Sequence, residues 1–136
     1  MSRLEFAITH RYDEIPALRV VLHHNGRSAE TVALVDTGAT YSVFDTSFAA
    51  ELDIDLSGPP YQDIIGFEVR RVRCYRRSLY VALYAGPVHV RTTAATVLFL
   101  PDIGVVSNVI GRDLMAGLPF AMIHDREELH LGLTNG

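Results

Sequence analysis

Three consecutive residues combine groups that could do chemistry at one turn. Asp36 supplies a carboxylate, Thr37 a hydroxyl, and Gly38 a backbone without a side chain. The apolar run at residues 31–35 comes directly before them, and such a run bounded by turn residues is typical of a buried strand. We therefore expect a strand that delivers the Asp36 carboxylate to a fixed point at its end.

One carboxylate is not enough to hydrolyse a peptide bond without a metal or a covalent nucleophile. In a pair, one carboxylate takes a proton from the attacking water while the other donates a proton to the developing oxyanion. Two such groups about 3 Å apart cannot both ionise easily, so they share a proton. The chain has 136 residues and a single Asp-Thr-Gly sequence. The second carboxylate would therefore come from another subunit, and a two-fold homodimer brings both copies of Asp36 to its axis.

A later segment adds to this pattern. Residues 109–115 predict a strand that breaks at Gly111 into a short helix. Asp-Thr-Gly-Ala at residues 36–39 and Ile-Gly-Arg-Asp at residues 110–113 resemble the two signature segments of the retroviral-like (retropepsin-type) aspartic proteases. The resemblance covers residues 17–133. It implies an all-β chain with the closed β-barrel of the acid protease fold and one or two short helices, in a single domain of residues 1–136.

The resemblance also implies roles for the residues of the turn. Asp36 would be the catalytic residue in each subunit of the homodimer, and Thr37 would hydrogen-bond across the two-fold axis to hold the two aspartates in place. Gly38 lets the backbone turn tightly and approach a bound peptide. Ala39 follows as the family's usual small residue, with its backbone available to the substrate.

Two residues of the later segment receive roles in the same way. Ile110 is expected to contact the substrate, and Arg112 to support the active site by tying the following helix to the region around the turn. The alternative is a surface position for Arg112 beside a helix-start Asp113. The helix dipole would then contribute roughly a few tenths of a kcal/mol to stability. We favour a structural role for Arg112 over a catalytic one.

A β-hairpin flap is expected between the two signature segments, because closure of a lid excludes water and positions the peptide. The best candidate is residues 62–73, with Ile64, Ile65, Gly66 and Phe67 near the tip and in contact with substrate. Viral flaps are rich in glycine, whereas this tip has only Gly66. The alternative is an ordinary edge hairpin with Ile65 and Phe67 in the core.

Short apolar segments separated by turn residues predict a β-rich chain. We expect strands at residues 17–24, 28–35, 41–44, 69–83, 88–93 and 95–100, with a turn at Asn25-Gly26 and a final hairpin of residues 120–124 and 129–133. Short helices are expected at residues 45–52, with capping side chains at the start, and at residues 112–116, stopped by Gly117.

A cluster of arginines within residues 70–77 invites a nucleic-acid interpretation, with Tyr75 among them. The commoner explanation is a solvated edge strand protected from aggregation by charge, and the net charge of −4 also opposes a strong attraction to nucleic acid. Another use would be selection of acidic peptides. All twelve basic residues of the chain are arginine, so lysine-dependent P-loop and Schiff-base chemistry have no candidate residue.

The histidines, the cysteine and Ser42 do not indicate a further functional site. The six histidines show no metal-binding spacing, so we expect no metal, and no cofactor is expected either. Cys74 lies in an alternating apolar pattern typical of a buried packing thiol, and Ser42 lacks a nucleophile elbow and is expected to be structural. A single cysteine fits a reducing compartment, and no signal peptide or membrane span is expected, which favours the cytoplasm.

The combined prediction is a homodimeric aspartic endopeptidase that cuts peptide or protein substrates with water activated by Asp36 of each subunit. One alternative is a catalytically silent domain of the same fold that dimerises or binds peptides without cutting them, since a fold does not guarantee activity. A weaker alternative is a monomeric β-barrel that binds nucleic acid or another acidic partner through the arginine strand. We expect neither nucleic acid nor membrane as a partner.

Overall fold

The computed structural model describes residues 6–65, 71–101 and 108–132, except for the side chain of Ile65. The strands of the larger sheet are β2 (Ala17–His24), β3 (Arg27–Val35), β4 (Val43–Asp45), β5 (Tyr61–Ile65), β6 (Arg71–Ala85), β7 (Val88–Leu100) and β8 (Val109–Ile110). A smaller sheet contains β1 (Ile8–Arg11), β9 (Phe120–Ile123) and β10 (Glu128–Leu131). The helices are α1 (Thr46–Glu51), α2 (Arg112–Met115) and the 3-10 helix η1 (His124–Arg126).

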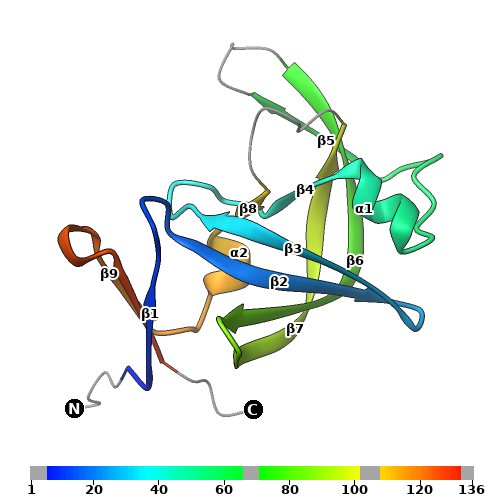
Figure 1. The fold of residues 1–136 in the computed structure, drawn as a ribbon. Coiled ribbons are helices and arrows are strands. Elements are labelled where there is room, and N and C mark those ends of the chain that lie inside the picture. Colours follow the sequence, from blue (N-terminus) through cyan, green and yellow to red (C-terminus); the bar gives the residue numbers. More distant parts are fainter. Residues whose placement is uncertain (1–5, 66–70, 102–107, 133–136) are drawn as a thin grey trace.

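The pairings of the larger sheet close on themselves (Figure 1). The strand order is β2-β3-β8-β4-β7-β6-β5, and β2 also pairs with β6, so six strands form a ring while β5 pairs with one end of β6 outside it. The prediction of an all-β chain with one or two short helices is confirmed. In the described part of the chain, no helix has both the length and the apolar character needed to cross a membrane.

The β2–β3 hairpin follows from local sequence. Along β2 the side chains of Leu18, Val20 and Leu22 are fully buried, and their neighbours are more exposed, as expected for a strand with one face on the core. The connecting turn has positive φ at both Asn25 (48°) and Gly26 (77°). Two such residues favour a tight hairpin whose twist matches that of the strands. The predicted strands and turn are confirmed here.

The segment that follows Asp36 departs from the prediction in one detail. Strand β4 begins at Val43 and not at residue 41, because Ser42 directs its backbone N–H and its hydroxyl to the side chain of Asp113. Helix α1 begins after Asp45, whose carboxylate accepts a hydrogen bond from the backbone N–H of Ser47 at 2.9 Å. The predicted cap and short helix are confirmed.

Strand β7 is one continuous element where two strands were expected, because Ala94 pairs with Tyr80 inside an antiparallel ladder with β6 that runs through the expected break. Strand β6 changes neighbours along its length. Residues 71–75 pair with β5, residues 75–85 pair with β7, and residues 80–84 pair with β2 as well. The described arginines therefore lie where β6 has one neighbouring strand, in agreement with the explanation of a charged strand edge.

The arginines of β6 have separate uses. The guanidinium of Arg77 donates to backbone carbonyls of the loop before β5, including those of Asp55 and Pro60 at 3.0 Å each. Arg73 lies over the ring of Tyr61, 4.7 Å from its centroid, and 3.9 Å from the carboxylate of Asp63. These contacts hold the loop and the β5–β6 hairpin together, which gives them a structural role that needs no nucleic acid.

Cys74 lies on the face of β6 opposite Arg73 and is fully buried. Burial, with a smaller contribution from the nearby carboxylate of Asp63, raises the pKa of the Cys74 thiol to about 11. The thiol therefore stays protonated and unreactive at neutral pH. The prediction of a packing residue is confirmed.

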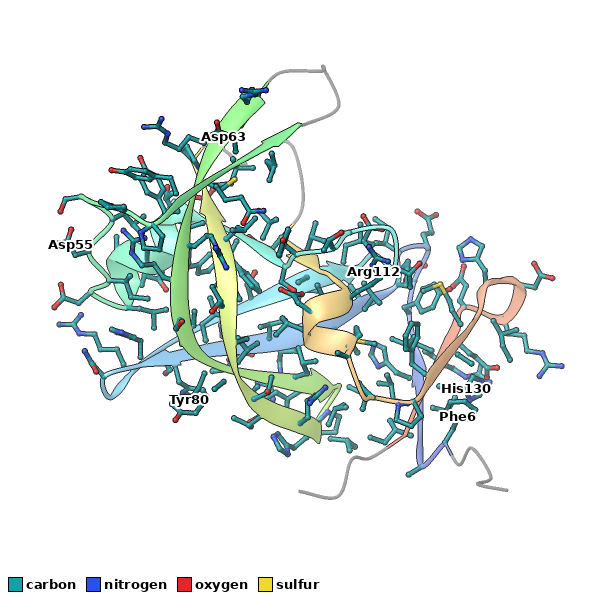
Figure 2. All side chains as sticks on the ribbon, turned by 180° about the vertical axis from the view of Figure 1, so that it is seen from behind. Phe6, Asp55, Asp63, Tyr80, Arg112 and His130 are labelled. Carbon is teal, nitrogen blue, oxygen red and sulfur yellow. The ribbon has the colours of Figure 1, made fainter. Side chains whose placement is uncertain are left out.

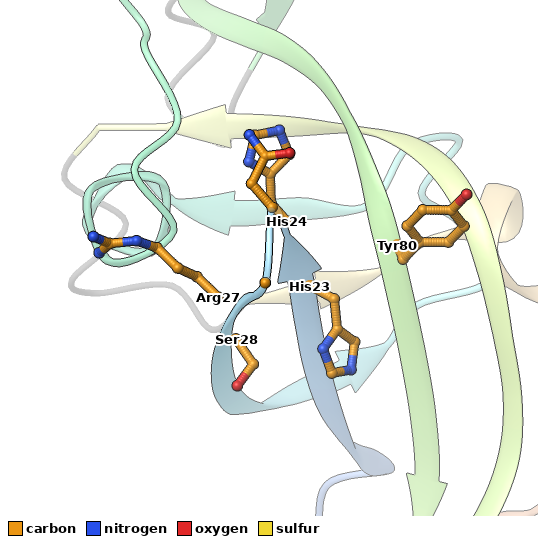
Figure 3. A pocket seen from close by; sticks show the side chains of 7 residues that line it. His23, His24, Arg27, Ser28 and Tyr80 are labelled. Carbon is orange, nitrogen blue, oxygen red and sulfur yellow. The ribbon is translucent and has the colours of Figure 1, made fainter.

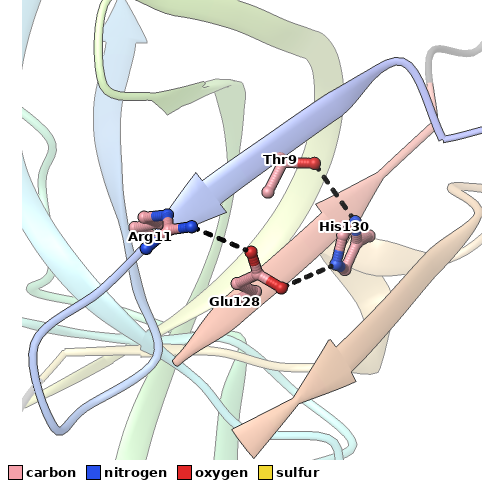
Figure 4. Close-up of polar contacts among 4 residues, drawn as sticks. All are labelled: Thr9, Arg11, Glu128 and His130. Carbon is pink, nitrogen blue, oxygen red and sulfur yellow. Dashed lines mark hydrogen bonds and ion pairs between the residues drawn. The ribbon is translucent and has the colours of Figure 1, made fainter. Parts of the chain in front are cut away.

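The smaller sheet has the order β1-β10-β9 and contains the predicted C-terminal hairpin. Its polar contacts are gathered on β1 and β10 (Figure 4). The half-buried ring of His130 contacts Thr9 at 3.2 Å and lies 3.6 Å from the carboxylate of Glu128, which is also 3.6 Å from Arg11. Figure 2 shows His130 beside Phe6, so the N-terminal segment packs on the C-terminal strands.

Candidate active site

Asp36 lies at the point where β3 leaves the ring. The backbone N–H of Asp36 donates to the carbonyl of Ile110 on β8 at 3.0 Å, and that of Val35 donates to the carbonyl of Pro16 at 2.8 Å. Strand β8 runs parallel to β3 and pairs Ile110 with Val35. The end of β3 is therefore held from both sides, and the position of the Asp36 backbone is set by two segments remote in sequence.

The carboxylate of Asp36 is exposed and has a fixed orientation. Its Oδ1 accepts a hydrogen bond from the backbone N–H of Gly38 at 2.9 Å, and its backbone carbonyl accepts one from Ala39 at 3.2 Å. A Cβ at Gly38 would lie 3.2 Å from Oδ1, so glycine gives the carboxylate room. Among the described residues, nothing donates to Oδ2. Thr37 is exposed beside it, and its hydroxyl makes no hydrogen bond within the part of the chain that the structure describes.

Arg112 connects α2 to the loop that follows Asp36. Its backbone N–H donates to the carbonyl of Ala39 at 2.9 Å, and its guanidinium Nη2 donates to the hydroxyl of Thr40 at 2.9 Å. Figure 2 shows Arg112 at the start of the helix. These contacts place Arg112 where the resemblance would put a supporting residue.

Glycine is required at position 111 by lack of space and not by backbone conformation. The backbone of Gly111 is extended, with φ −90° and ψ −175°, which any residue can adopt. A Cβ at this position would lie 2.6 Å from the carbonyl carbon of Tyr41, 2.7 Å from its oxygen and 3.0 Å from the oxygen of Ala39. Backbone atoms cannot move aside as a flexible side chain can. The loop after Asp36 therefore crosses the β8–α2 junction at a distance that only glycine permits.

A buried polar link lies beneath this crossing. The fully buried Ser42 donates to Asp113 twice, from its hydroxyl at 2.6 Å and from its backbone N–H at 3.0 Å. The Ser42 hydroxyl in turn accepts from the backbone N–H of Gly111 at 2.8 Å. Sequence reasoning treated Ser42 as structural without a partner and Asp113 only as a helix start. Nothing in their spacing signals the contact.

Asn108 is a second residue that the sequence did not single out. Its side-chain Nδ2 donates to the hydroxyl of Thr31 at 3.0 Å, and its Oδ1 accepts from the backbone N–H of Asp45 at 3.1 Å. Its backbone carbonyl accepts from Leu34 at 2.8 Å. The side chain of Asn108 therefore joins β3, the strand that leads to Asp36, to the end of β4.

The predicted flap corresponds in part to an observed hairpin. Strands β5 and β6 pair from Tyr61 opposite Tyr75 to Ile65 opposite Arg71, and the hairpin projects beyond the ring (Figure 1). Ile64 is half-buried and pairs with Val72. Gly66 and Phe67 at the predicted tip lie outside the described residues, as does the side chain of Ile65. Their contacts with substrate stay a prediction, and so does the alternative that places Ile65 and Phe67 in the core.

The structure thus brings together Asp36, Thr37, Gly38, Ala39, Ile110 and Arg112. Ile110 is fully buried and presents its carbonyl oxygen, not its side chain, to Asp36. Its predicted contact with substrate therefore finds no exposed side chain in this subunit. The roles of the other residues stay predictions, although their positions agree with those roles.

The described residues form at least two surface hollows. One, of about 340 Å³, surrounds the β2–β3 turn and is lined by His23, His24, Arg27 and Tyr80 among others (Figure 3). It lies at the opposite end of β3 from Asp36. The other, of about 490 Å³, lies between the N-terminal segment and the outer face of β3. Within the described ranges, no group of three or more His, Cys, Asp or Glu side chains could hold a metal ion.

Comparisons with known proteins agree with this geometry. A family described as aspartyl protease matches residues 20–114, which include Asp36 and Arg112. A retropepsin-like aspartic protease from Rickettsia conorii is similar in structure, with a TM-score of 0.61 and 17% identity over 91% of this chain and 97% of the other, which shows the fold. The EIAV protease complexed with the inhibitor HBY-793 matches with a TM-score of 0.47 and 22% identity, over 79% and 91% of the two chains. No curated protein sequence matches.

Proposed function

Because this chain belongs to the aspartyl protease family, we propose that it is an endopeptidase whose active unit is a homodimer, with the two Asp36 carboxylates activating one water between them. The observation that carries the proposal is the state of Asp36 in a single subunit. Its carboxylate is exposed at a rigidly held strand end and, counting the described residues alone, accepts one hydrogen bond, from Gly38. It is thus oriented for a partner that this subunit does not supply.

In the proposed reaction the two carboxylates share one proton. The ionised Asp36 takes a proton from the water as the water attacks the peptide carbonyl, and the protonated Asp36 donates its proton to the oxyanion. The Gly38 N–H holds one oxygen of each carboxylate, so the other oxygen is left to face the water. The exposed hydroxyl of Thr37 is proposed to hydrogen-bond to the second subunit and to fix the distance between the two aspartates.

The substrate is proposed to bind as an extended peptide between the Asp36 loop and the β5–β6 hairpin, by the hydrogen bonding of an added β-strand. The hairpin projects from the ring, and closure over the peptide would exclude water from the reaction (Figure 1). Arg112 is proposed as a positioning residue, because it holds the loop at Thr40 and touches no reacting atom.

The experiment that tests the proposal compares the wild type with Asp36→Asn on a diverse peptide pool at mildly acid and neutral pH. We expect cleavage by the wild type and a loss of about 10²–10⁴-fold in rate for the variant, the usual contribution of general acid–base catalysis. Asp125→Asn is the matched control, since Asp125 is also an exposed aspartate but lies in η1. It should cut as fast as the wild type.

The mass in solution must be measured on the same samples. A dimer that cuts, with Asp36→Asn remaining dimeric and inactive, supports the proposal. A folded wild type that stays monomeric at every concentration, or cuts equally well without the carboxylate, overturns it. A stable dimer that binds peptides and cuts none would instead identify a catalytically silent, peptide-binding member of the family.

A further inference from the structure

The hollow at the β2–β3 turn is lined by basic and hydroxyl groups and by no acidic side chain. It has a volume of about 340 Å³ (Figure 3). The lining residues are His23, His24, Asn25, Gly26, Arg27, Ser28 and Tyr80. The chain as a whole is acidic, with a net charge of −4. A concave surface without carboxylates in such a chain favours an anionic ligand.

Polar side chains stand in a row on one side of this hollow. His23 on β2 lies opposite Ser28 on β3 and opposite Tyr80 on β6. Residues directly opposite each other in neighbouring antiparallel strands share a face of the sheet, with their Cβ atoms about 5 Å apart. The Ser28 hydroxyl, the His23 imidazole and the Tyr80 phenol are therefore presented together, at a spacing that suits a ligand with several acceptor oxygens.

The polar groups of the hollow are left over from the internal hydrogen bonding. Between described residues, no hydrogen bond uses the side chain of His23, Ser28 or Tyr80. The Nδ1 atom of His24 is buried and also lacks a partner there. A buried polar atom without a partner costs free energy, so a ligand that bonds to it is favoured.

Arg27 supplies the positive charge. Its side chain is exposed and directed toward α1 (Figure 3), where Nη1 donates one long hydrogen bond to the carbonyl of Glu51 at 3.4 Å. Further along the same hairpin, Arg19 and Glu30 neutralise each other at 2.7 Å. The charge of Arg27 is not neutralised in this way among the described residues, and its long side chain can swing toward the row. A guanidinium binds two phosphate oxygens at once.

We propose that this hollow is a second binding site of the chain, for a small phosphate monoester. Arg27 and Ser28 hold the phosphate oxygens, with ring nitrogens of His23 and His24 as further donors. The ring of Tyr80 is 60% exposed and offers a flat apolar face to a planar group attached to the phosphate. The inference does not depend on the proposed function, because the hollow lies at the opposite end of β3 from Asp36.

The test titrates inorganic phosphate, phenyl phosphate and benzoate into the ¹⁵N-labelled full chain and follows the backbone amide resonances. We expect saturable shifts centred on residues 23–28 and on Tyr80. Phenyl phosphate should bind about threefold or more tightly than the inorganic ion, because its ring stacks on Tyr80. It should also bind about tenfold more tightly than benzoate, which has a single charge and fewer acceptor oxygens.

Two variants and a matched control locate the site. Arg27→Gln should weaken phenyl phosphate binding about tenfold, because charge-assisted hydrogen bonds are lost. Arg126→Gln is the control, since Arg126 is also an exposed arginine but lies in η1 and does not line the hollow. It should keep the wild-type affinity. Tyr80→Ser should remove most of the advantage of phenyl phosphate over inorganic phosphate.

Each outcome supports or overturns the site. Binding that is weakened by Arg27→Gln and kept in Arg126→Gln supports it. Absence of saturable shifts at residues 23–28 overturns it, and so does equal weakening by both arginine variants, because the anion would then respond to net charge alone. Equal affinity for phenyl phosphate and inorganic phosphate overturns the monoester and the role of Tyr80. A wild type that binds phenyl phosphate here and cuts no peptide would contradict the proposed endopeptidase and leave this site intact.

Discussion

The two ends of β3 are built in different ways. At one end, Asn25 and Gly26 form a turn from adjacent residues, and a Cβ added at Gly26 would meet no atom within 4 Å. At the other end, the loop after Asp36 is held by residues far along the chain, and Gly111 is pressed against the backbone of Tyr41. The turn needs glycine at position 26 because φ there is 77°, whereas the loop crossing needs glycine at position 111 because a Cβ would clash with the backbone of Tyr41. The strand end that carries the candidate catalytic groups therefore depends on remote contacts, whereas the other end does not.

The largest effect on stability is expected from Gly111→Ala. The new Cβ would lie 2.6 Å from a carbonyl carbon, so the loop and the β8–α2 junction would have to separate. We expect a loss of about 3 kcal/mol in the free energy of unfolding, within the range for overpacking a buried site, together with loss of peptide cleavage. Urea unfolding measures the change in the free energy of unfolding. A variant of wild-type stability would break the comparison, since Gly111 would then not be limited by space.

Asp113→Ala is expected to cost about 2 kcal/mol, because it leaves the hydroxyl and backbone N–H of the buried Ser42 without their charged acceptor. Ser42→Ala should cost about 1–2 kcal/mol, since the N–H of Gly111 loses its acceptor. The double variant should cost less than the sum of the two single variants, which a double-mutant cycle by urea unfolding measures. Strict additivity would show that the two side chains do not act as a unit.

Substitutions at the β2–β3 turn should lower stability without changing peptide cleavage, in contrast to substitutions near Asp36. Gly26→Ala should cost about 1 kcal/mol, because alanine is strained at positive φ, although nothing lies within 4 Å of its Cβ. Gly26→Asn should be milder, because asparagine tolerates this conformation. Neither change should alter peptide cleavage. Thermal unfolding and the cleavage assay check both, and a turn variant that abolished cleavage would contradict the separation of the two ends.

The smallest effect on stability is expected from Arg112→Gln. The bond from its guanidinium to Thr40 is exposed, so its loss should change the free energy of unfolding by about 0.5 kcal/mol or less. The loop beside Asp36 would nevertheless lose one of its hydrogen bonds to α2. We expect kcat to fall while KM changes little, and Arg112→Lys to restore part of the rate. Equal activity in wild type and Arg112→Gln would remove Arg112 from the supporting residues.

Much of the fold was predictable because its signals are local. The alternation of buried residues in β2, the capping Asp45 before α1 and the turn at Asn25-Gly26 each depend on a few neighbouring residues. The errors came from pairing. Residues 88–93 and 95–100 were expected to form two strands, and only the ladder with β6 shows that they form one. Residue types do not tell whether a strand continues when its partner strand does.

The candidate site also has one part that local sequence predicts and another that depends on contacts between distant residues. Residue types alone identified the carboxylate, the hydroxyl and the glycine at residues 36–38 and led to the prediction of a second carboxylate from another subunit. Only the tertiary structure decided what holds them, namely the Ile110 carbonyl, the Ser42–Asp113 link and the tight crossing at Gly111. The reason is physical: residue type sets which chemistry is available and local backbone preference sets the turn. A contact between residues about seventy positions apart depends on how the strands pair and pack, which no short stretch of sequence encodes.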